Sequence, residues 1–202
     1  MPHWAPIAAQ HDKNHQEEIM LPDILQKKLS RHFHFRDLDK DGYVERSDWE
    51  KCAQNLAAIR GWETGSPEYG NVMARHVAMW LAFWQPADLN QDGKVSLPEY
   101  LHLAETQRKM GFNYEMEQVR KLFAAVFDTI DLDHDGEISL AEYKLFFQAW
   151  GLEEALAVDA FSSLDLNADA RLSREAFLQY GINFYINDEP DVAGNLIFGP
   201  YE

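Results

Sequence analysis

The chain has 202 residues, enough for one domain or two small ones with a sizeable core; 46% of them are hydrophobic and 13% aromatic. This composition excludes an intrinsically disordered or low-complexity chain. The formal net charge of −16 argues against a nucleic-acid binder, which needs a basic face, and suits a protein that collects cations.

The first eighteen residues, MPHWAPIAAQHDKNHQEE, lack the basic start, apolar segment and cleavage site of a secretory signal. The most apolar run, residues 77–84, is too short to span a bilayer. The lone cysteine, Cys52, has no partner for an internal disulfide, which fits a reducing compartment, and we expect it to be a buried packing residue. These features predict a soluble, cytoplasmic protein without a membrane or nucleic-acid partner.

Four twelve-residue segments repeat one pattern along the chain. They are loop 1, DLDKDGYVERSD (37–48), loop 2, DLNQDGKVSLPE (88–99), loop 3, DLDHDGEISLAE (131–142), and loop 4, DLNADARLSREA (165–176). Amphipathic helices are predicted on both sides, so each unit has the helix–loop–helix pattern of an EF-hand. Such a loop surrounds a calcium ion with oxygens from positions 1, 3, 5, 7 and 12, position 7 contributing its backbone carbonyl.

Loop 1 departs from the pattern at its end. Its predicted ligands are Asp37, Asp39, Asp41, the Tyr43 carbonyl and Asp48. Aspartate is one methylene shorter than glutamate, so we expect it to reach the ion with a single oxygen. Fewer protein oxygens favour a smaller octahedral ion, and we therefore predict calcium binding with competition from Mg²⁺, chiefly in this loop. The helix after it is expected to bury Trp49, Cys52, Ala53 and Leu56.

A long link, Gly61 to Gly70, precedes the helix that enters loop 2. The predicted buried face of that helix comprises Met73, Val77, Trp80, Leu81 and Trp84. Loop 2 has every expected ligand: Asp88, Asn90, Asp92, the Lys94 carbonyl and Glu99. Ser96 and Glu99 also match a Ser-x-x-Glu capping box at the start of the exiting helix.

Loop 3 is complete as well. The helix before it is expected to bury Val119, Leu122, Phe123, Val126, Phe127 and Ile130. The predicted ligands are Asp131, Asp133, Asp135, the Glu137 carbonyl and Glu142. Ser139 and Glu142 form a second capping box, and the helix that follows carries a stripe of Tyr143, Phe146, Phe147 and Trp150.

Loop 4 has lost two of the residues that matter. A shorter stripe precedes it: Ala157, Ala160, Phe161 and Leu164. Ala170 replaces the sixth-position glycine, where a positive φ strains alanine by about 1–2 kcal/mol. Ala176 removes the last carboxylate, and Glu175 stands one place early, about 100° around the helix. We predict an empty loop, kept because it pairs with loop 3.

The aliphatic residues at position 8 predict short strands that pair the loops: Val44, Val95, Ile138 and Leu172. We therefore expect an all-α fold with four EF-hands in two pairs, joined by short inter-loop β pairings. The predicted segments are 19–109 with loops 1 and 2, 115–183 with loop 3 and the degenerate loop 4, and a tail over 184–202.

The chain resembles the sarcoplasmic calcium-binding proteins and the calerythrins over nearly its whole length. The resemblance rests on four hands, the long link, the Asp that ends loop 1, the segment VERSDWEK (44–51) and the tail NFYINDEPDVAGNLIFGPYE (183–202). It implies a compact fold with a closed aromatic core and a tail that packs back on the helices. It also implies a role as a calcium and magnesium buffer.

Three functions follow as alternatives. The first is a buffer with three calcium sites, favoured because the chain has many aromatic residues and only six methionines. The second is a calcium sensor that exposes apolar surface to a protein partner. The third is a photoprotein-like or coelenterazine-binding member. It is disfavoured because Tyr180 and Phe184 stand where the resemblance to photoproteins implies a histidine and a tryptophan. His76 and His102 lack obvious partners, and no catalytic set is apparent, so we expect a non-enzyme that is a monomer or homodimer.

Overall fold

The computed structural model describes residues 21–201. Several predictions from the sequence fall outside this range. They concern the absence of a secretory signal in residues 1–18, the first two residues of the predicted segment 19–109, and the last residue of the tail.

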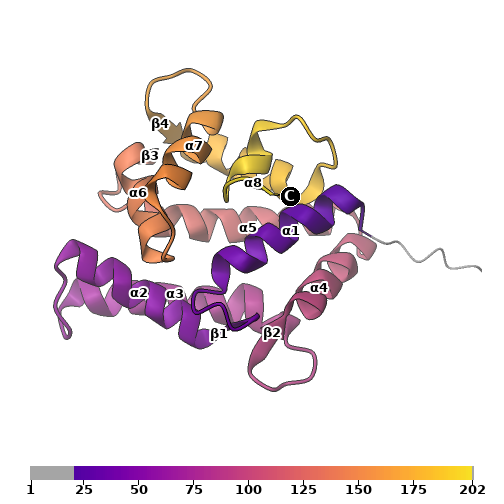
Figure 1. Ribbon diagram of the computed structural model, residues 1–202, viewed down its shortest axis with the longest axis horizontal. Coiled ribbons are helices and arrows are strands. Elements are labelled where there is room, and N and C mark those ends of the chain that lie inside the picture. The colour runs from indigo at the N-terminus through magenta and orange to yellow at the C-terminus, as the bar shows by residue number, and fades with distance from the viewer. Residues whose placement is uncertain (1–20, 202) are drawn as a thin grey trace, which may run out of the picture.

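Within residues 21–201 the chain forms eight α-helices and four three-residue strands (Figure 1). The α-helices are α1 Asp23–Arg36, α2 Arg46–Arg60, α3 Pro67–Met79, α4 Leu97–Lys109, α5 Phe112–Ile130, α6 Leu140–Ala149, α7 Glu154–Leu164 and α8 Arg174–Ile186. The strands are β1 Tyr43–Glu45, β2 Lys94–Ser96, β3 Glu137–Ser139 and β4 Arg171–Ser173. A π-helical turn spans Trp80–Trp84, and 3-10 turns span Gln85–Ala87 and Ala193–Leu196. No helix in this part of the chain combines the length and apolarity needed to cross a bilayer.

The four strands pair as the sequence predicts. β1 and β2 run antiparallel with Val44 opposite Val95, and β3 and β4 run antiparallel with Ile138 opposite Leu172. All four of these position-8 side chains are buried. Each strand pairing thus joins the two loops of a pair. Separately, α8 extends to Ile186, so the first three residues of the expected tail are helical. The division into 19–109 and 115–183 as separate segments stays a prediction.

The predicted buried faces are confirmed for the helices that follow loops 1 and 3 and for those that enter loops 3 and 4. The face predicted for residues 73–84 is wrong in part, because Leu81 is 47% exposed while Val72 and Met79 are buried. Leu81 lies within the π-helical turn, which departs from regular α-helical spacing, whereas Val72 and Met79 lie before it in α3, on a face one residue earlier than predicted. Trp80 and Trp84 still reach the core.

The link before loop 2 is shorter than predicted. Gly61 ends α2 with a left-handed φ of 70°, and Ser66 caps α3 by accepting a hydrogen bond from the Tyr69 N–H at 3.1 Å. Pro67 occupies the first helical position, where its missing N–H costs nothing. The last four residues of the expected link are therefore helical.

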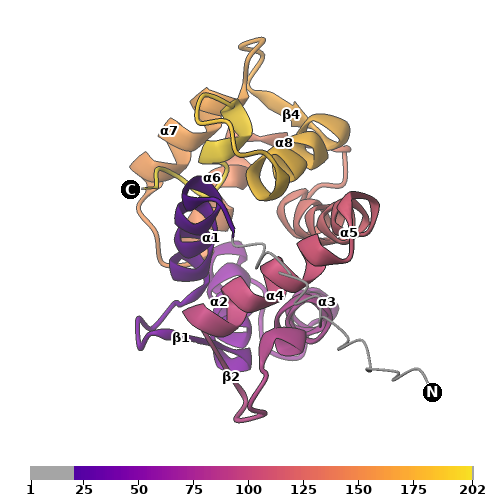
Figure 2. The same ribbon diagram turned by 90° about the vertical axis from the view of Figure 1, so that its right-hand side faces the viewer.

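Helix α1 lies at the centre of the molecule. It packs against α4 on one side and α8 on the other, and Figure 2 shows it between the two halves of the chain. Helices α2 and α6 also pack together, as do α3 and α5. The two loop pairs therefore share one continuous hydrophobic core rather than forming separate cores.

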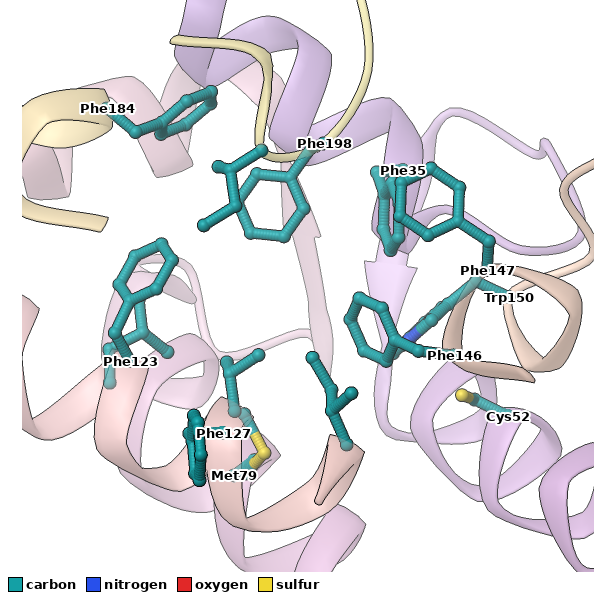
Figure 3. Close-up of a cluster of buried hydrophobic side chains, with 14 of the residues drawn as sticks. Phe35, Cys52, Met79, Phe123, Phe127, Phe146, Phe147, Trp150, Phe184 and Phe198 are labelled. Atoms are coloured by element: carbon teal, nitrogen blue, oxygen red, sulfur yellow. The ribbon is translucent and has the colours of Figure 1, made fainter. Parts of the chain in front are cut away.

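The C-terminal tail packs back on the helices, as expected. Phe198 is 1% exposed, and Figure 3 shows its ring among core side chains that include Phe35, Phe123 and Phe184. Two groups bind the tail backbone: Arg31 Nε donates to the Phe198 carbonyl at 2.8 Å, and the Tyr143 hydroxyl donates to the Ile197 carbonyl. The tail is thus a fixed part of the core.

Buried Lys28 joins α1 to α8 and to the tail. Its ammonium group donates to the carbonyls of Asn183 and Asn187, at 3.1 and 2.6 Å, and to Asn195 Oδ1 at 2.9 Å. Asn195 in turn donates from Nδ2 to the backbone carbonyls of Glu189 and Pro190. One buried cation therefore links two backbone carbonyls at the end of α8 to α1 and to the tail.

Cys52 is fully buried, as predicted, but the expectation that His76 lacks a partner is wrong. His76 Nε2 lies 3.6 Å from Cys52 Sγ, and Nδ1 lies 2.9 Å from the Val72 carbonyl. Burial raises the pKa of the Cys52 thiol, so the thiol stays protonated and unreactive. This pair fills space between α2 and α3.

We expect His76 to weaken the fold in acid. Burial lowers its pKa to about 4, whereas the unfolded imidazole binds a proton near pH 6.5. Between these values the unfolded chain holds more protons than the native one, so stability falls as the pH falls, by up to about 3 kcal/mol. Urea unfolding of calcium-free protein at about pH 7 and about pH 4.5 should show a smaller loss for His76→Gln than for the wild type. His102→Gln, at an exposed position of α4, is the control; an identical loss in all three proteins would refute the prediction.

Candidate metal centres

All four loops close around the carboxylate at position 1. The N–H of residue 6 donates to its Oδ2, at 3.0 Å from Gly42 to Asp37, 3.0 Å from Gly93 to Asp88 and 3.2 Å from Gly136 to Asp131. These glycines have φ between 86° and 91°, a conformation that side chains disfavour. The backbone of each loop is therefore wound so that the early side chains point toward one centre.

Loops 1 and 3 each bring three of their predicted carboxylate ligands close together. Single oxygens of Asp37, Asp39 and Asp41 lie within 4.8 Å of one another, and the same holds for Asp131, Asp133 and Glu142. Calcium takes oxygens at about 2.3–2.6 Å, so oxygens at this spacing suit one ion between them. Tyr43 and Glu137, whose carbonyls are predicted to complete these sites, are the first residues of β1 and β3.

The surroundings of the position-1 carboxylates in loops 1 and 3 show whether a cation would suit these sites. Asp37 and Asp131 are 5% and 6% exposed, and in the described part of the chain Oδ1 of each is buried without a hydrogen-bond partner. A buried carboxylate oxygen without a partner is costly. A divalent cation would satisfy it, so the donor set fits a hard ion.

Burial also raises the pKa of two carboxyl groups in loop 1. The pKa of Asp37 is raised, and that of Asp48 is raised to about 6. In Asp48 burial outweighs the opposing hydrogen bonds from the N–H groups of Glu45 and Leu38. Crowded, desolvated carboxylates of this kind are those that a cation stabilises most.

The position-12 carboxylates occupy equivalent places in loops 1 to 3. Glu142 accepts from the Leu132 N–H at 2.8 Å and the Ser139 N–H at 2.9 Å, and Glu99 makes the same contacts in loop 2. Both predicted capping boxes are therefore present. Asp48, although shorter, accepts from the corresponding N–H groups of Leu38 and Glu45 at 3.2 and 2.7 Å.

Loop 2 is more open. Asp88 Oδ1 accepts from the Asp92 N–H at 3.2 Å, so both of its oxygens have backbone donors. The Asn90 amide group donates to Asp92 Oδ2 at 3.0 Å, and its Oδ1 accepts from the Asp92 N–H at 2.9 Å. Two of its predicted ligands, Asn90 and Asp92, are thus hydrogen-bonded to each other.

Loop 4 keeps the loop shape without the ligands. The Ala170 N–H donates to Asp165 Oδ2 at 2.8 Å, as glycine does in the other loops, and Ala170 has a φ of 61°. Where the other loops have a carboxylate, Ala176 leaves an open hollow of about 320 Å³, lined in part by Asn167, Asp169 and Tyr180. Glu175 instead lies 3.5 Å from Arg120 on α5.

Relief of the strain at Ala170 should stabilise the protein. A left-handed backbone costs a non-glycine residue about 1–2 kcal/mol, and the greater unfolded-state entropy of glycine offsets part of this. We expect Ala170→Gly to raise the free energy of unfolding by about 0.5–1 kcal/mol in urea denaturation. Ala74→Gly, at an exposed position inside α3, should lower it by about 1 kcal/mol. A loss of stability in both variants would show that Ala170 is not strained.

Sequence reasoning missed a buried polar cluster on α1. His32 Nδ1 lies 2.7 Å from the hydroxyls of both Tyr100 and Tyr185, which are 2.6 Å apart. Arg36 Nε donates to His32 Nε2 at 3.1 Å, so the imidazole carries its proton on Nδ1. Burial, together with the Arg36 charge, lowers the pKa of His32 and keeps the ring neutral. An amphipathic stripe gives no signal for such a cluster.

Arg36 is buried among aromatic rings instead of beside a carboxylate. Its guanidinium lies 4.5–5.5 Å from the ring centres of Phe35, Trp49, Phe146, Trp150 and Phe198. Cation–π attraction compensates for part of its lost hydration, although burial still lowers its pKa to about 10. The side chain fills the space between α1, α2, α6 and the tail.

Comparison with known proteins agrees with this geometry. A protein-family model described as "EF hand" matches residues 86–104 and 123–147, which contain loops 2 and 3. Calerythrin of Saccharopolyspora erythraea is 26% identical over 163 residues, covering 79% of this chain and 90% of calerythrin. The calcium-loaded apo form of the coelenterazine-binding protein of Renilla muelleri has a TM-score of 0.69 at 24% identity, covering 89% of this chain and 99% of that one. A sarcoplasmic calcium-binding protein from amphioxus has a TM-score of 0.64 at 19% identity, covering 89% and 98%. At these identities the two structures share the fold alone.

Proposed function

We propose that this chain, an EF-hand protein similar to calerythrin and the sarcoplasmic calcium-binding proteins, binds three calcium ions through loops 1, 2 and 3 and buffers them. The observation that carries the proposal is a pair of buried oxygens, on Asp37 and Asp131, that have no hydrogen-bond partner among residues 21–201; each lies at the start of a loop whose carboxylates converge. The matched segments 86–104 and 123–147 support loops 2 and 3 independently.

In this proposal calcium acts on the fold through charge. Three ions at +2 each would bring the formal charge from −16 to −10 and relieve the repulsion among the carboxylates of each loop. An ion that binds only the native state stabilises it in proportion to the logarithm of its concentration. Calcium should therefore raise the unfolding temperature of the protein, and chelation should lower it.

A calorimetric calcium titration of the metal-free protein tests the proposal directly. Three ions per chain at micromolar concentration would support it, and a fourth would overturn the assignment of loop 4 as empty. An apolar dye such as ANS, followed in the same titration, separates buffer from sensor. Dye fluorescence that falls as the sites fill indicates that calcium closes the core, whereas a rise would favour a sensor with a protein partner.

Loop 1 is proposed to bind Mg²⁺ as well as Ca²⁺. The shorter side chain of Asp48, held by the N–H groups of Leu38 and Glu45, supports this reading because a single aspartate oxygen suits octahedral coordination. Millimolar Mg²⁺ should weaken calcium binding at loop 1 more than at loops 2 and 3. Equal calcium affinities at loop 1 with and without Mg²⁺ would contradict this part of the proposal.

A luciferin-binding role is disfavoured by the packing of the core. Phe198 and Arg36 occupy its centre, and the hollow beside Tyr100 and Tyr185 measures about 30 Å³, far below the roughly 300 Å³ of the smallest typical ligand pockets. Tyr180, which stands where a histidine is expected in a photoprotein, donates its hydroxyl to the Leu164 carbonyl at 2.6 Å. Incubation with coelenterazine followed by calcium should give no light.

The proposal gives the chain no catalytic role and places it in the reducing environment of the cytoplasm. The protonated, fully buried thiol of Cys52 supports both points, because it is neither a nucleophile nor available for a disulfide.

A further inference from the structure

Loop 4 places a positively charged side chain beside the carboxylates of loop 3. The guanidinium of Arg171, at position 7 of loop 4, lies 2.8 Å from Asp135 Oδ2 and 3.0 Å from Glu137 Oε2 through the same nitrogen, Nη1. Asp135 and Glu137 stand at positions 5 and 7 of loop 3. The pairing of β3 with β4, which sets Ser139 opposite Arg171, brings this side chain across to loop 3.

The first loop pair repeats the arrangement. Lys94, at position 7 of loop 2, reaches Asp41 Oδ2 at 3.4 Å and also binds Glu45, both in loop 1. In each pair the basic residue at position 7 of the second loop thus contacts the position-5 carboxylate of the first. Two independent occurrences at one loop position indicate a feature of how the pairs are built.

Lys94 and Arg171 differ in whether the loop that carries each of them is proposed to bind calcium. The carbonyl of Lys94 belongs to the proposed ligand set of loop 2, whereas loop 4 lacks a position-12 carboxylate because Ala176 stands there. Arg171 has no ion of its own loop to repel it, and within residues 21–201 its guanidinium hydrogen-bonds to Asp135 and Glu137 of loop 3. Its role should therefore be visible in loop 3 alone.

We propose that Arg171 is a tethered counter-cation of loop 3, which steadies Asp135 in the metal-free protein and weakens calcium binding there. This inference rests on the proposed function of loop 3 as a calcium site. It gives the degenerate loop a regulatory part in addition to its structural one.

The sign of the effect follows from charge. Asp135 accepts hydrogen bonds at both oxygens, from the Glu137 N–H at 2.9 Å on Oδ1 and from the Arg171 guanidinium at 2.8 Å on Oδ2. An arriving calcium ion must share Asp135 with a fixed positive charge, and the two cations repel each other. Exposed charges interact weakly, but the ion is divalent, so loss of Arg171 should tighten calcium binding in loop 3 by about 3- to 10-fold.

The glycine amides offer a separate readout for each loop. The N–H groups of Gly42, Gly93 and Gly136 each donate to the position-1 aspartate of their own loop, so each NMR signal should respond to an ion in that loop. In Arg171→Gln, the Gly136 signal should titrate at about 3- to 10-fold lower free calcium. The midpoints of Gly42 and Gly93 should not change, and the shift should shrink in high salt.

Arg120→Gln is the matched control, since it removes the same charge from an exposed pair with Glu175 on α5 and α8. It should leave the Gly136 midpoint unchanged. An unchanged or higher midpoint in Arg171→Gln, or an equal shift in Arg120→Gln, would overturn the inference while the calcium site stands. A wild-type Gly136 signal that calcium never moves would remove the calcium site itself, and the inference with it.

Discussion

Replacement of Phe198 by alanine is expected to lower the free energy of unfolding by about 3–5 kcal/mol, as large-to-small changes at packed aromatic positions do. Its ring is stacked on His32 with centres 4.3 Å apart, and it contacts Phe35 and Phe184 at 5.1 and 5.2 Å. The tail backbone would keep its hydrogen bonds from Arg31 and Tyr143, but the cavity would lie at the centre of the core.

Urea denaturation with calcium held constant measures this effect. Leu166→Ala is the control, because Leu166 is 75% exposed in loop 4 and should change stability by less than about 0.5 kcal/mol. If Phe198→Ala unfolds at the wild-type urea concentration, the tail does not pack as described. We also expect the variant to bind ANS in the presence of calcium, since loss of the ring opens apolar surface.

Substitution of Glu142 by glutamine is expected to weaken calcium binding in loop 3 by about 100-fold or more. The carboxylate is held at the loop by the N–H groups of Leu132 and Ser139, and glutamine preserves its size while removing its charge and one of its two ligand oxygens. Calorimetry should then count two ions per chain at micromolar calcium in place of three. The Gly136 amide signal should no longer respond in that range.

Glu175→Gln provides the comparison for this prediction. Glu175 also lies in the first turn of a helix that leaves a loop, one residue before position 12, and its side chain is 74% exposed beside Arg120. It should leave the number and affinity of the sites unchanged. Three ions bound by Glu142→Gln with wild-type affinity would mean that position 12 of loop 3 is not a ligand.

Local patterns account for most of what the sequence predicts correctly. Loop spacing, capping boxes and helix faces depend on residues a few positions apart, so Ser139 with Glu142 or Val126 with Ile130 are visible in the chain itself. The two strand pairs follow because four similar loops each carry an aliphatic residue at position 8. The packed tail came from the family resemblance.

Contacts between distant residues were not predictable in this way. His32 meets Tyr100 and Tyr185 across 68 and 153 residues, and no periodicity links them. The same holds for Cys52 with His76, and for Arg171 with Asp135, which depends on the register of a three-residue strand. At Trp80–Trp84 the backbone becomes π-helical, and a pattern based on 3.6 residues per turn does not predict this.

The aromatic enclosure of Arg36 also gives the molecule an optical probe of its own. Trp49 directly follows loop 1, Trp150 lies at the end of the helix that leaves loop 3, and their rings meet edge to face with centres 5.0 Å apart. The guanidinium lies 4.9 and 4.5 Å from them. Indole emission depends on nearby charge and ring contacts, so a movement at either loop changes the light from one shared chromophore pair. The share of the intrinsic emission that comes from Trp49 and Trp150, two of the six tryptophans, therefore responds to loops 1 and 3 together.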